Sequence, residues 1–138
     1  MRILCLDVGD KKIGVSLSDP THSIAQALKV YRRNSLKEDL KEFKDLISEH
    51  DVERIVVGLP KDLSGMIGKK AKEVLEFAEV LEKYAGVPIV LWDERFTTNE
   101  AHRVFEMASI SHKKRRPYLD MMASQLILQG YLDANRTR

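Results

Sequence analysis

Short apolar runs that end in acidic residues recur at distant points of this 138-residue chain. Asp7 follows the run Ile3–Leu6, and Asp93 and Glu94 follow Ile89–Trp92. Asp120 opens the last helical stretch, just after the basic run His112–Arg116. Carboxylates are costly at the edge of an apolar core unless something neutralises them, and divalent metal ions do so well. The pattern therefore predicts strands with a metal site at their ends, beside a basic segment suited to a phosphate chain.

The first part of the chain has the periodicity of β-strands. Residues 2–8 predict a central strand that is apolar on both faces, and residues 13–18 alternate as in a half-buried strand. The turn over residues 9–12 has hairpin length, so these two strands should be antiparallel. A third strand is expected over residues 25–32, after the break at Asp19 and Pro20.

Helical signals dominate the remainder. Ser35 and Glu38 form a capping box, followed by an apolar stripe. A second amphipathic helix is predicted over residues 69–85, with Gly86 as its stop, and a short helix capped by Thr97 runs to residue 108. A basic loop over 109–116 then precedes a final helix that begins at Pro117. The predicted inward positions are Leu36, Leu40, Phe43 and Ile47 in the first helix and Val74, Ala78, Leu81 and Ala85 in the second.

Two compact apolar runs between these helices predict further strands, at residues 54–59 and 88–93. Because helical crossovers join parallel strands, these two should run parallel to each other. The expected fold is therefore α/β: a mixed five-stranded sheet flanked by helices, with strands one to three antiparallel. The glycine-containing stretch 61–68 is expected to be a loop.

Composition limits the class of protein. The length suits one domain over residues 1–138, and 43% apolar residues suit a globular chain. The net charge is only +2, so clustering of the basic residues carries more information than their number. Cys5, the single cysteine, lies in an apolar run and is expected to be a buried, unreactive side chain. With neither a signal-peptide pattern nor a membrane-length apolar segment, we expect a cytoplasmic protein.

Each acidic residue also has an ordinary structural explanation. Asp7 occupies the position of a turn-starting residue, and Asp93 or Glu94 could begin a loop and pair with Arg95. Asp120 would lie in the first turn of its helix, where the helix dipole favours a carboxylate. The basic run could equally be a solvated connector. In favour of a shared site, the two strands and the final helix can converge on one end of such a sheet.

Four segments resemble the motifs of the YqgF (RuvX) family: Leu6–Asp19, Val57–Pro60, Asp93–Ala101 and Asp120–Gln129. They occur in the family's order and cover nearly the whole chain. One departure is Ser64, which stands before Gly65 where an acidic or amide residue is common in the family. The resemblance implies a ribonuclease-H-like fold related to RuvC-type Holliday-junction resolvases. It also implies a cytoplasmic nuclease that processes the 5′ end of pre-16S ribosomal RNA.

The family motifs imply that Asp7, Glu94 and Asp120 are the catalytic metal ligands. Strand alternation alone leaves Asp93 and Glu94 open, because both faces of their strand are apolar. Such a set would hold two divalent ions roughly 4 Å apart, and its oxygen-only chemistry favours Mg²⁺ or Mn²⁺ over zinc. The residues expected to hold the nucleic-acid backbone are Lys11, Lys12, Lys113, Lys114, Arg115 and Arg116.

Several functions remain open at this stage. A metal-dependent endonuclease acting on pre-16S RNA comes first, a Holliday-junction resolvase second, and a non-catalytic RNA-binding module third. An actin-like kinase would share a phosphate loop like Asp7–Gly9, but this chain is too short for its second domain. The expected partners are structured RNA or branched DNA, in a ribosomal precursor particle and without a membrane. The sequence allows a monomer or a homodimer, although a resolvase would need a dimer for two matched cuts.

Overall fold

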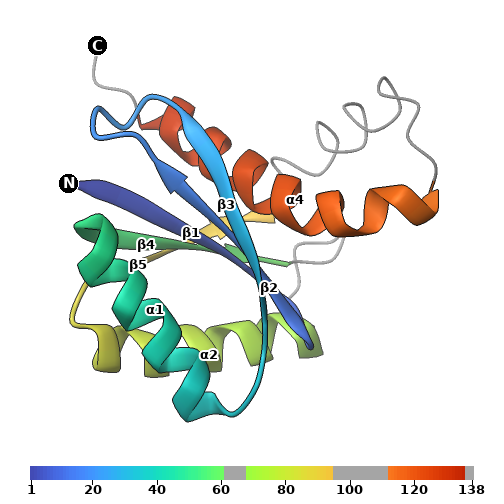
Figure 1. Cartoon of the computed structure of the whole chain (residues 1–138). Coiled ribbons are helices and arrows are strands. Elements are labelled where there is room, and N and C mark those ends of the chain that lie inside the picture. Colours follow the sequence, from blue (N-terminus) through green and yellow to red (C-terminus); the bar gives the residue numbers. More distant parts are fainter. Residues whose placement is uncertain (61–67, 95–111, 136–138) are drawn as a thin grey trace.

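The computed structural model describes residues 1–60, 68–94 and 112–135, with the backbone alone described for residues 112–121. Five strands form one sheet in the order β3-β2-β1-β4-β5. Helices α1 (Leu36–His50) and α2 (Lys69–Ala85) cover one face, and α4 (His112–Ala134) covers the other (Figure 1). The strands are β1 (Arg2–Val8), β2 (Lys12–Ser18), β3 (Ala25–Arg32), β4 (Val52–Leu59) and β5 (Ile89–Asp93).

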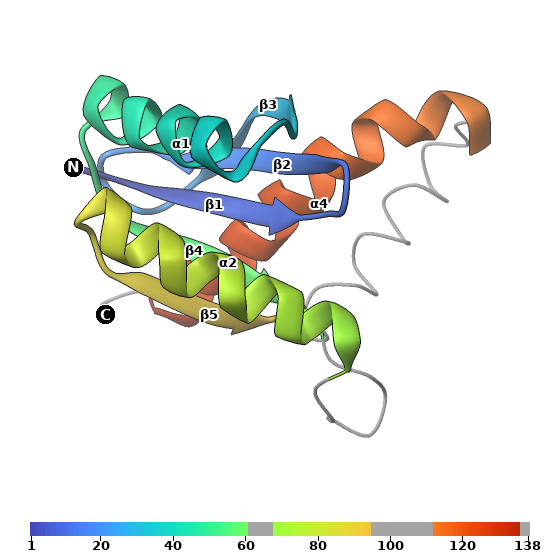
Figure 2. The ribbon, with the colours of Figure 1, turned by 90° about the horizontal axis from the view of Figure 1, so that it is seen from below.

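Strand directions confirm the sequence prediction of a mixed α/β sheet. β1 runs antiparallel to β2, and β2 runs antiparallel to β3. β4 lies parallel to both β1 and β5, as helical crossovers require. Parallel strands end at a common edge, and the end of β1, the start of α2 and the N-terminal end of α4 all lie on that side (Figure 2). We call it the carboxyl edge of the sheet.

The two helices on the first face begin and end much as predicted. Ser35 caps α1, and its side chain accepts a hydrogen bond of 3.2 Å from the backbone N–H of Glu38. α2 ends at Gly86, whose φ of 74° gives the left-handed turn that glycine adopts at no steric cost. One predicted inward residue is wrong: Leu36 is 49% exposed, and Leu46 is buried in the core instead. Leu36 is the first residue of α1, where the chain is still approaching the sheet.

The alternation of β1 divides the core into two layers. Leu4, Leu6 and Val8 pack with α1 and α2, whereas Ile3 and Cys5 pack against α4. The same alternation puts position 7 on the α4 face. Cys5 is fully buried, as predicted, and burial raises the pKa of its thiol to about 12. This central strand therefore holds the sheet to both helical layers.

The final helix differs from its prediction. α4 begins at His112, so Lys113–Arg116 lie within a helix and not in a loop. The sequence predicts Pro117 as the first helical residue, but it is the sixth residue of α4. A proline at this place removes one backbone hydrogen bond and crowds the carbonyl group four residues earlier, yet α4 continues through it to Ala134. The predicted helix over 97–108, the loop segment 61–67 and residues 109–111 lie outside the described residues.

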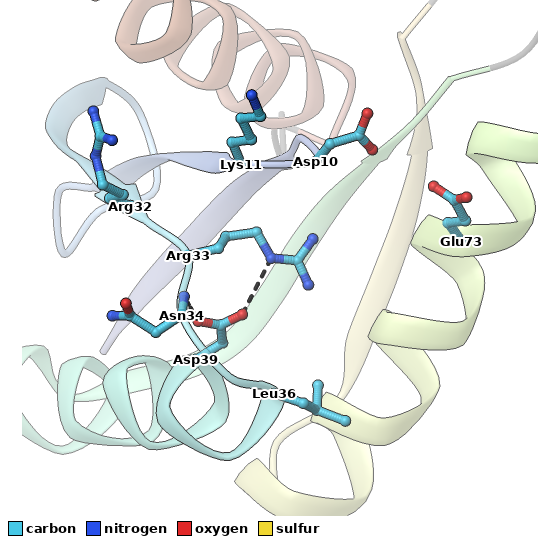
Figure 3. A pocket seen from close by; sticks show the side chains of 8 residues that line it. All are labelled: Asp10, Lys11, Arg32, Arg33, Asn34, Leu36, Asp39 and Glu73. Atoms are coloured by element: carbon cyan, nitrogen blue, oxygen red, sulfur yellow. Dashed lines mark hydrogen bonds and ion pairs between the residues drawn. The ribbon is translucent and has the colours of Figure 1, made fainter.

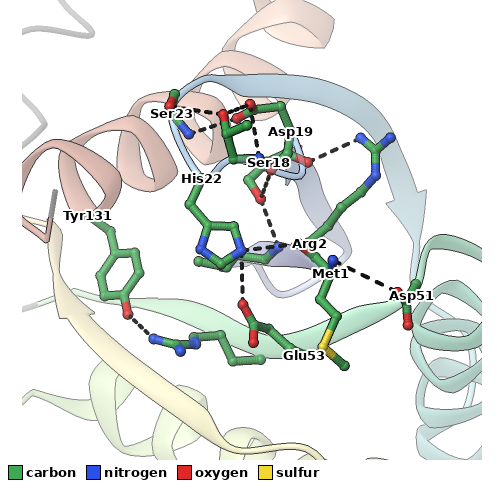
Figure 4. Close-up of polar contacts among 12 residues, drawn as sticks. Met1, Arg2, Ser18, Asp19, His22, Ser23, Asp51, Glu53 and Tyr131 are labelled. Carbon is green, nitrogen blue, oxygen red and sulfur yellow. Dashed lines mark hydrogen bonds and ion pairs between the residues drawn. The ribbon is translucent and has the colours of Figure 1, made fainter. Parts of the chain in front are cut away.

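Polar contacts close the end of the sheet that lies away from the carboxyl edge (Figure 4). Arg2 donates a hydrogen bond of 3.2 Å to the carbonyl of Ser18, and His22 Nε2 lies 2.9 Å from Glu53 Oε1. Arg54 on β4 donates a 3.0 Å hydrogen bond to the hydroxyl of Tyr131 on α4. Within the described part of the chain, no helix has the length and apolar character needed to span a membrane.

Candidate active site

Asp7 is the penultimate residue of β1, at the carboxyl edge of the sheet. It lies opposite Gly14 of β2 in the antiparallel register and is half-buried. The strand ends here because Gly9 and the hairpin turn follow, with the N–H of Gly9 donating a 2.9 Å bond to the carbonyl of Lys12. A carboxylate is therefore held at the end of an otherwise apolar central strand.

Glu94 immediately follows β5, and its side chain forms a hydrogen bond with that of Asp7. Burial, then the charge of Asp7, then this hydrogen bond raise the pKa of Glu94 from 4.5 to about 8. The ammonium group of Lys70 acts in the opposite direction. The direction of this shift is the one expected for two carboxyl groups in contact, because ionising the second group places two like charges side by side.

The structure separates Glu94 from its neighbour Asp93, which the sequence could not do. Val90 and Trp92 of β5 pack on the α4 side, whereas Ile89 packs on the α1 and α2 side. Alternation along the strand therefore puts Asp93 on the face opposite to Asp7. The charge of Asp93 has a smaller effect on the pKa of Glu94 than that of Asp7. Glu94 is the residue brought into contact with Asp7.

Gly58 on β4 provides the space that this contact needs. A Cβ at this position would lie 2.7 Å from Oε1 of Glu94 and 2.8 Å from Cδ1 of Ile127. Real Cβ atoms essentially never approach other heavy atoms so closely. The motif Val57–Pro60 therefore has a definite local function: its glycine lets the Glu94 side chain cross β4 beneath α4.

Small polar groups lie fully buried between β1, β2 and α4. Ser16 Oγ and Ser124 Oγ are 2.9 Å apart, and Ser124 donates a 3.1 Å hydrogen bond to the carbonyl of Cys5. These bonds fix α4 against the main chain two residues before Asp7.

Position 120 is one helical turn before Ser124, so the helix backbone runs toward the carboxyl edge there. The side chain of Asp120 lies outside the described part of α4.

The donor chemistry of the Asp7–Glu94 pair fits a hard divalent cation. Two carboxyl groups held in contact in a half-buried site repel each other when both are ionised, and a divalent ion relieves that repulsion. Among the side chains that the structure describes, no group of three metal-binding residues occurs. The structure thus brings together two members of the predicted set, Asp7 and Glu94, and leaves the third undescribed.

The predicted nucleic-acid contacts lie on two elements. Lys11 and Lys12 are at the turn between β1 and β2, close in the chain to Asp7, and Lys113–Arg116 are in the N-terminal half of α4. Sequence reasoning missed Lys70, whose charge acts on Glu94 from the first turn of α2. In the sequence it resembles any lysine on the solvated side of an amphipathic helix. Lys70 differs from those other lysines only because the fold brings the start of α2 near Glu94, which follows β5.

Comparison with known proteins identifies the family of this chain. The family RuvX, described as Holliday junction resolvase, matches residues 1–134. The chain belongs to the RuvX family. A relative from Thermoanaerobacter pseudethanolicus is 48% identical over 139 residues, covering 100% of both chains. A relative from Clostridium novyi is 47% identical, covering 97% of this chain and 99% of its own. Both are named "Putative pre-16S rRNA nuclease". The nuclease expected from the sequence is thereby confirmed at the level of the family.

Solved structures confirm the ribonuclease-H-like fold of this RuvX family member. Thermus thermophilus RuvC in complex with a Holliday junction substrate superposes with a TM-score of 0.63 at 14% identity, covering 100% of this chain and 98% of that one. The fowlpox virus resolvase in complex with Holliday junction DNA has a TM-score of 0.58 at 13% identity, covering 99% and 100%. At these identities the likeness establishes the fold alone.

Proposed function

We propose that this chain is a metal-dependent endonuclease that hydrolyses phosphodiester bonds, with Asp7, Glu94 and Asp120 as the metal ligands. The observation that carries the proposal is the hydrogen-bonded pair of Asp7 and Glu94, with the pKa of Glu94 raised to about 8. Pairs of carboxylates forced together are typical of functional sites, because a fold gains no stability from their repulsion.

A bound Mg²⁺ or Mn²⁺ would stabilise the charge that develops on the phosphate and lower the pKa of a bound water. The chain's own contribution is to hold the ligands. β1 fixes Asp7 in the middle of the sheet, and Gly58 leaves room for Glu94 to reach it. The buried bond from Ser124 to Cys5 holds α4, and with it position 120, at the same edge.

The first substrate we propose is precursor 16S ribosomal RNA. Its support is the name carried by relatives at 44–48% identity that share nearly all of their length with this chain. Aromatic residues make up only 7% of the chain, so few side chains are available to stack on bases. We therefore expect recognition of backbone shape, within a ribosomal precursor particle in the cytoplasm.

A Holliday junction is the second candidate substrate. Its support is the description of the matching family and the fold shared with RuvC, which has been solved bound to a junction. Symmetric resolution needs two matched cuts, so this activity requires two active sites, which a homodimer would supply. Cleavage of a junction thus requires a dimer of this protein, whereas cleavage of the RNA does not.

The test compares both substrates side by side. The purified protein is incubated with a pre-16S RNA fragment and with a synthetic four-way junction, in Mg²⁺ and then in Mn²⁺, and its mass in solution is measured in the same buffer. We expect cleavage near the 5′ end of the mature RNA. Paired symmetric nicks by a stable dimer, with the RNA intact, would reverse the order of the candidates. Binding of RNA without cleavage in either metal would instead indicate a non-catalytic RNA-binding module.

A further inference from the structure

Two neighbouring arginines at the end of β3 lie on opposite faces of the sheet. Tyr31 packs in the core beneath α1 and α2, opposite Ile13 of β2, so the next residue, Arg32, faces the α4 side. Lys11 in the β1–β2 turn also points to the α4 side, whereas Arg33 points to the other (Figure 3). The side chains of Lys11 and Arg32 therefore share a face of the sheet with α4.

Arg33 is part of the framework of the β1–β2 turn. Its Nε lies 3.1 Å from Oδ2 of Asp39, which is only 1% exposed, so the charge of Arg33 is neutralised within the fold. Arg33 Nη1 donates a 2.9 Å bond to the carbonyl of Gly9, and its backbone N–H donates a 2.8 Å bond to the carbonyl of Lys11. These bonds hold the turn from the α1 and α2 side. They fix the backbone that carries Lys11, which lowers the entropy that a bound partner must remove.

The charges of Lys11 and Arg32 are not used by the fold in this way. Both side chains are exposed, and neither makes an ion pair or a side-chain hydrogen bond with any part of the chain that the structure describes. Two exposed cations on one face, beside the edge that carries the candidate active site, suit the phosphates of a nucleic-acid backbone.

The register of the sheet places Arg32 close to Asp7 on the α4 face. Asp7 lies opposite Gly14 of β2, which lies opposite Val30 of β3, and Arg32 is two residues further along the same side of β3. With strands about 4.8 Å apart and a rise of about 3.4 Å per residue, the Cα atoms of Asp7 and Arg32 are about 12 Å apart. A B-form strand rises about 3.4 Å per nucleotide, so Arg32 lies within roughly three or four nucleotides of the carboxylate.

The two sides of Asp7 on this face differ in character. Toward β5 the α4 face presents Val90 and Trp92, which pack in the apolar core. Toward β3 it presents the exposed cations Lys11 and Arg32. The N-terminal half of α4, which contains the basic run Lys113–Arg116, also reaches the carboxyl edge on this side of the sheet (Figure 2). A phosphate chain that leaves the carboxylates is therefore attracted toward β3.

We propose that Lys11 and Arg32 bind phosphates of the substrate strand on the α4 face, so that this strand leaves the candidate active site across β2 toward the end of β3. The inference rests on the proposed nuclease function. It adds Arg32 to the nucleic-acid contacts expected from the sequence and gives the strand a direction across the sheet. The sequence did not single out Arg32, because the face that it occupies depends on the register of β3 with β2.

The test measures nucleic-acid affinity against salt concentration for Lys11→Gln, Arg32→Gln and the double variant. Lys37→Gln is the matched control, because Lys37 is an exposed lysine in the first turn of α1, on the other face of the sheet. Binding of the labelled pre-16S RNA fragment and of the four-way junction is followed by fluorescence anisotropy in a chelating buffer, which prevents cleavage. Each single variant should lower the slope of log affinity against log salt by about one, and the double variant by about two. Arg32→Lys should keep the wild-type slope, because it keeps the charge.

The outcomes separate this inference from the function on which it rests. Slopes of Lys11→Gln and Arg32→Gln equal to that of Lys37→Gln, in proteins with unchanged circular dichroism, would overturn the inference while leaving the nuclease in place. A reduced slope for Lys11→Gln alone would show that the strand does not reach β3, and the proposal would be wrong. A wild-type protein that bound neither RNA nor DNA would instead overturn the proposed function.

Discussion

Asp7 at the end of β1 and Glu94 after β5 are joined by a side-chain hydrogen bond that crosses the intervening strand β4. Neither residue is near the other in sequence, and no apolar packing requires them to meet. The contact exists because Gly58 of β4 has no Cβ to obstruct it. A fold that keeps two carboxyl groups in contact and half-buried forgoes some stability in the metal-free state.

The pH dependence of the metal-free protein should reflect this pair. The folded pKa of Glu94 is raised from 4.5 to about 8, so its contribution favours folding below pH 4.5 and is lost as pH rises through about 8. We expect Glu94→Gln to remove this loss and to raise the melting temperature at pH 9 in chelating buffer. Thermal unfolding at pH 5, 7 and 9 measures the effect.

Magnesium should offset the loss of stability that the metal-free wild type shows at high pH. Addition of Mg²⁺ at pH 9 should raise its melting temperature, because an ion that binds only the folded state stabilises it. Glu94→Gln should respond much less, whereas Asp93→Asn, the neighbouring control, should respond like the wild type. Equal responses of the two variants to Mg²⁺ would contradict the assignment of Glu94 as the ligand.

The space at Gly58 should be essential for activity. In Gly58→Ala the new methyl group would meet Glu94 and Ile127 at under 3 Å, so Glu94 must move. Overpacking of this kind costs about 1–3 kcal/mol of stability. Misplacement of a catalytic group by about 1 Å can cost roughly 100-fold in rate. Cleavage rates and urea unfolding measure the two effects.

Gly68→Ala is the matched control for this substitution, because nothing lies within 4 Å of a Cβ there. Gly68 is the N-cap of α2, where alanine should cost about 1 kcal/mol or less. It should leave the cleavage rate nearly unchanged. A Gly58→Ala protein as active as the Gly68→Ala control would mean that Glu94 need not occupy its observed position.

The basic run of α4 should contribute sequence-independent affinity. Neutralising Lys113, Lys114, Arg115 and Arg116 together should weaken binding to RNA and DNA of any sequence. The slope of log affinity against log salt should fall by about one for each lost phosphate contact. Lys41→Gln on α1, where Lys41 is 74% exposed, provides a control for a change in surface charge alone. An unchanged slope would make this run a solvated part of the helix.

Asp19 should contribute to stability in a way that acid removes. Its carboxylate accepts bonds of 2.7 and 2.8 Å from the backbone N–H groups of Ser23 and Ile24 (Figure 4). These bonds, led by the one from Ile24, hold the pKa of Asp19 well below its usual range. The stabilisation is therefore present above the unfolded pKa of about 3.9 and lost as pH falls below it.

Asp19→Asn should lower the melting temperature at pH 7, and the difference from wild type should narrow toward pH 3. Thermal unfolding across this pH range measures it. Asp45→Asn, an exposed aspartate of α1 with an ion pair of 3.9 Å, is the control and should change little at either pH. A constant difference between wild type and Asp19→Asn from pH 7 to pH 3 would exclude the charged hydrogen bonds as its cause.

The sheet could be predicted because its signals are local. The apolar run of β1, the alternation in β2 and the cap at Ser35 each depend on a few adjacent residues, and all three are confirmed. The start of α4 was missed because proline is common at the first turn of helices, which made Pro117 look like a beginning. Local pattern cannot exclude that a helix extends further toward the N-terminus.

The candidate site was only partly predictable, for a different reason. The choice between Asp93 and Glu94 and the need for a glycine at position 58 depend on contacts between β1, β4 and β5. Lys70 was missed because its effect is on Glu94, a residue of another element, and the pattern of its own helix does not reveal that contact. The family motifs named Asp7, Glu94 and Asp120, and their assignment as metal ligands stays a prediction.

The most direct measurement is the rate of Mg²⁺-dependent cleavage by wild type and by Asp7→Asn, on the pre-16S RNA fragment and on the four-way junction. The amide has the size of the carboxyl group but lacks the charge that holds a divalent ion. We predict that Asp7→Asn keeps the circular dichroism of the wild type and loses cleavage of every substrate that the wild type cuts. An Asp7→Asn protein that cleaves at the wild-type rate in Mg²⁺ would contradict the account.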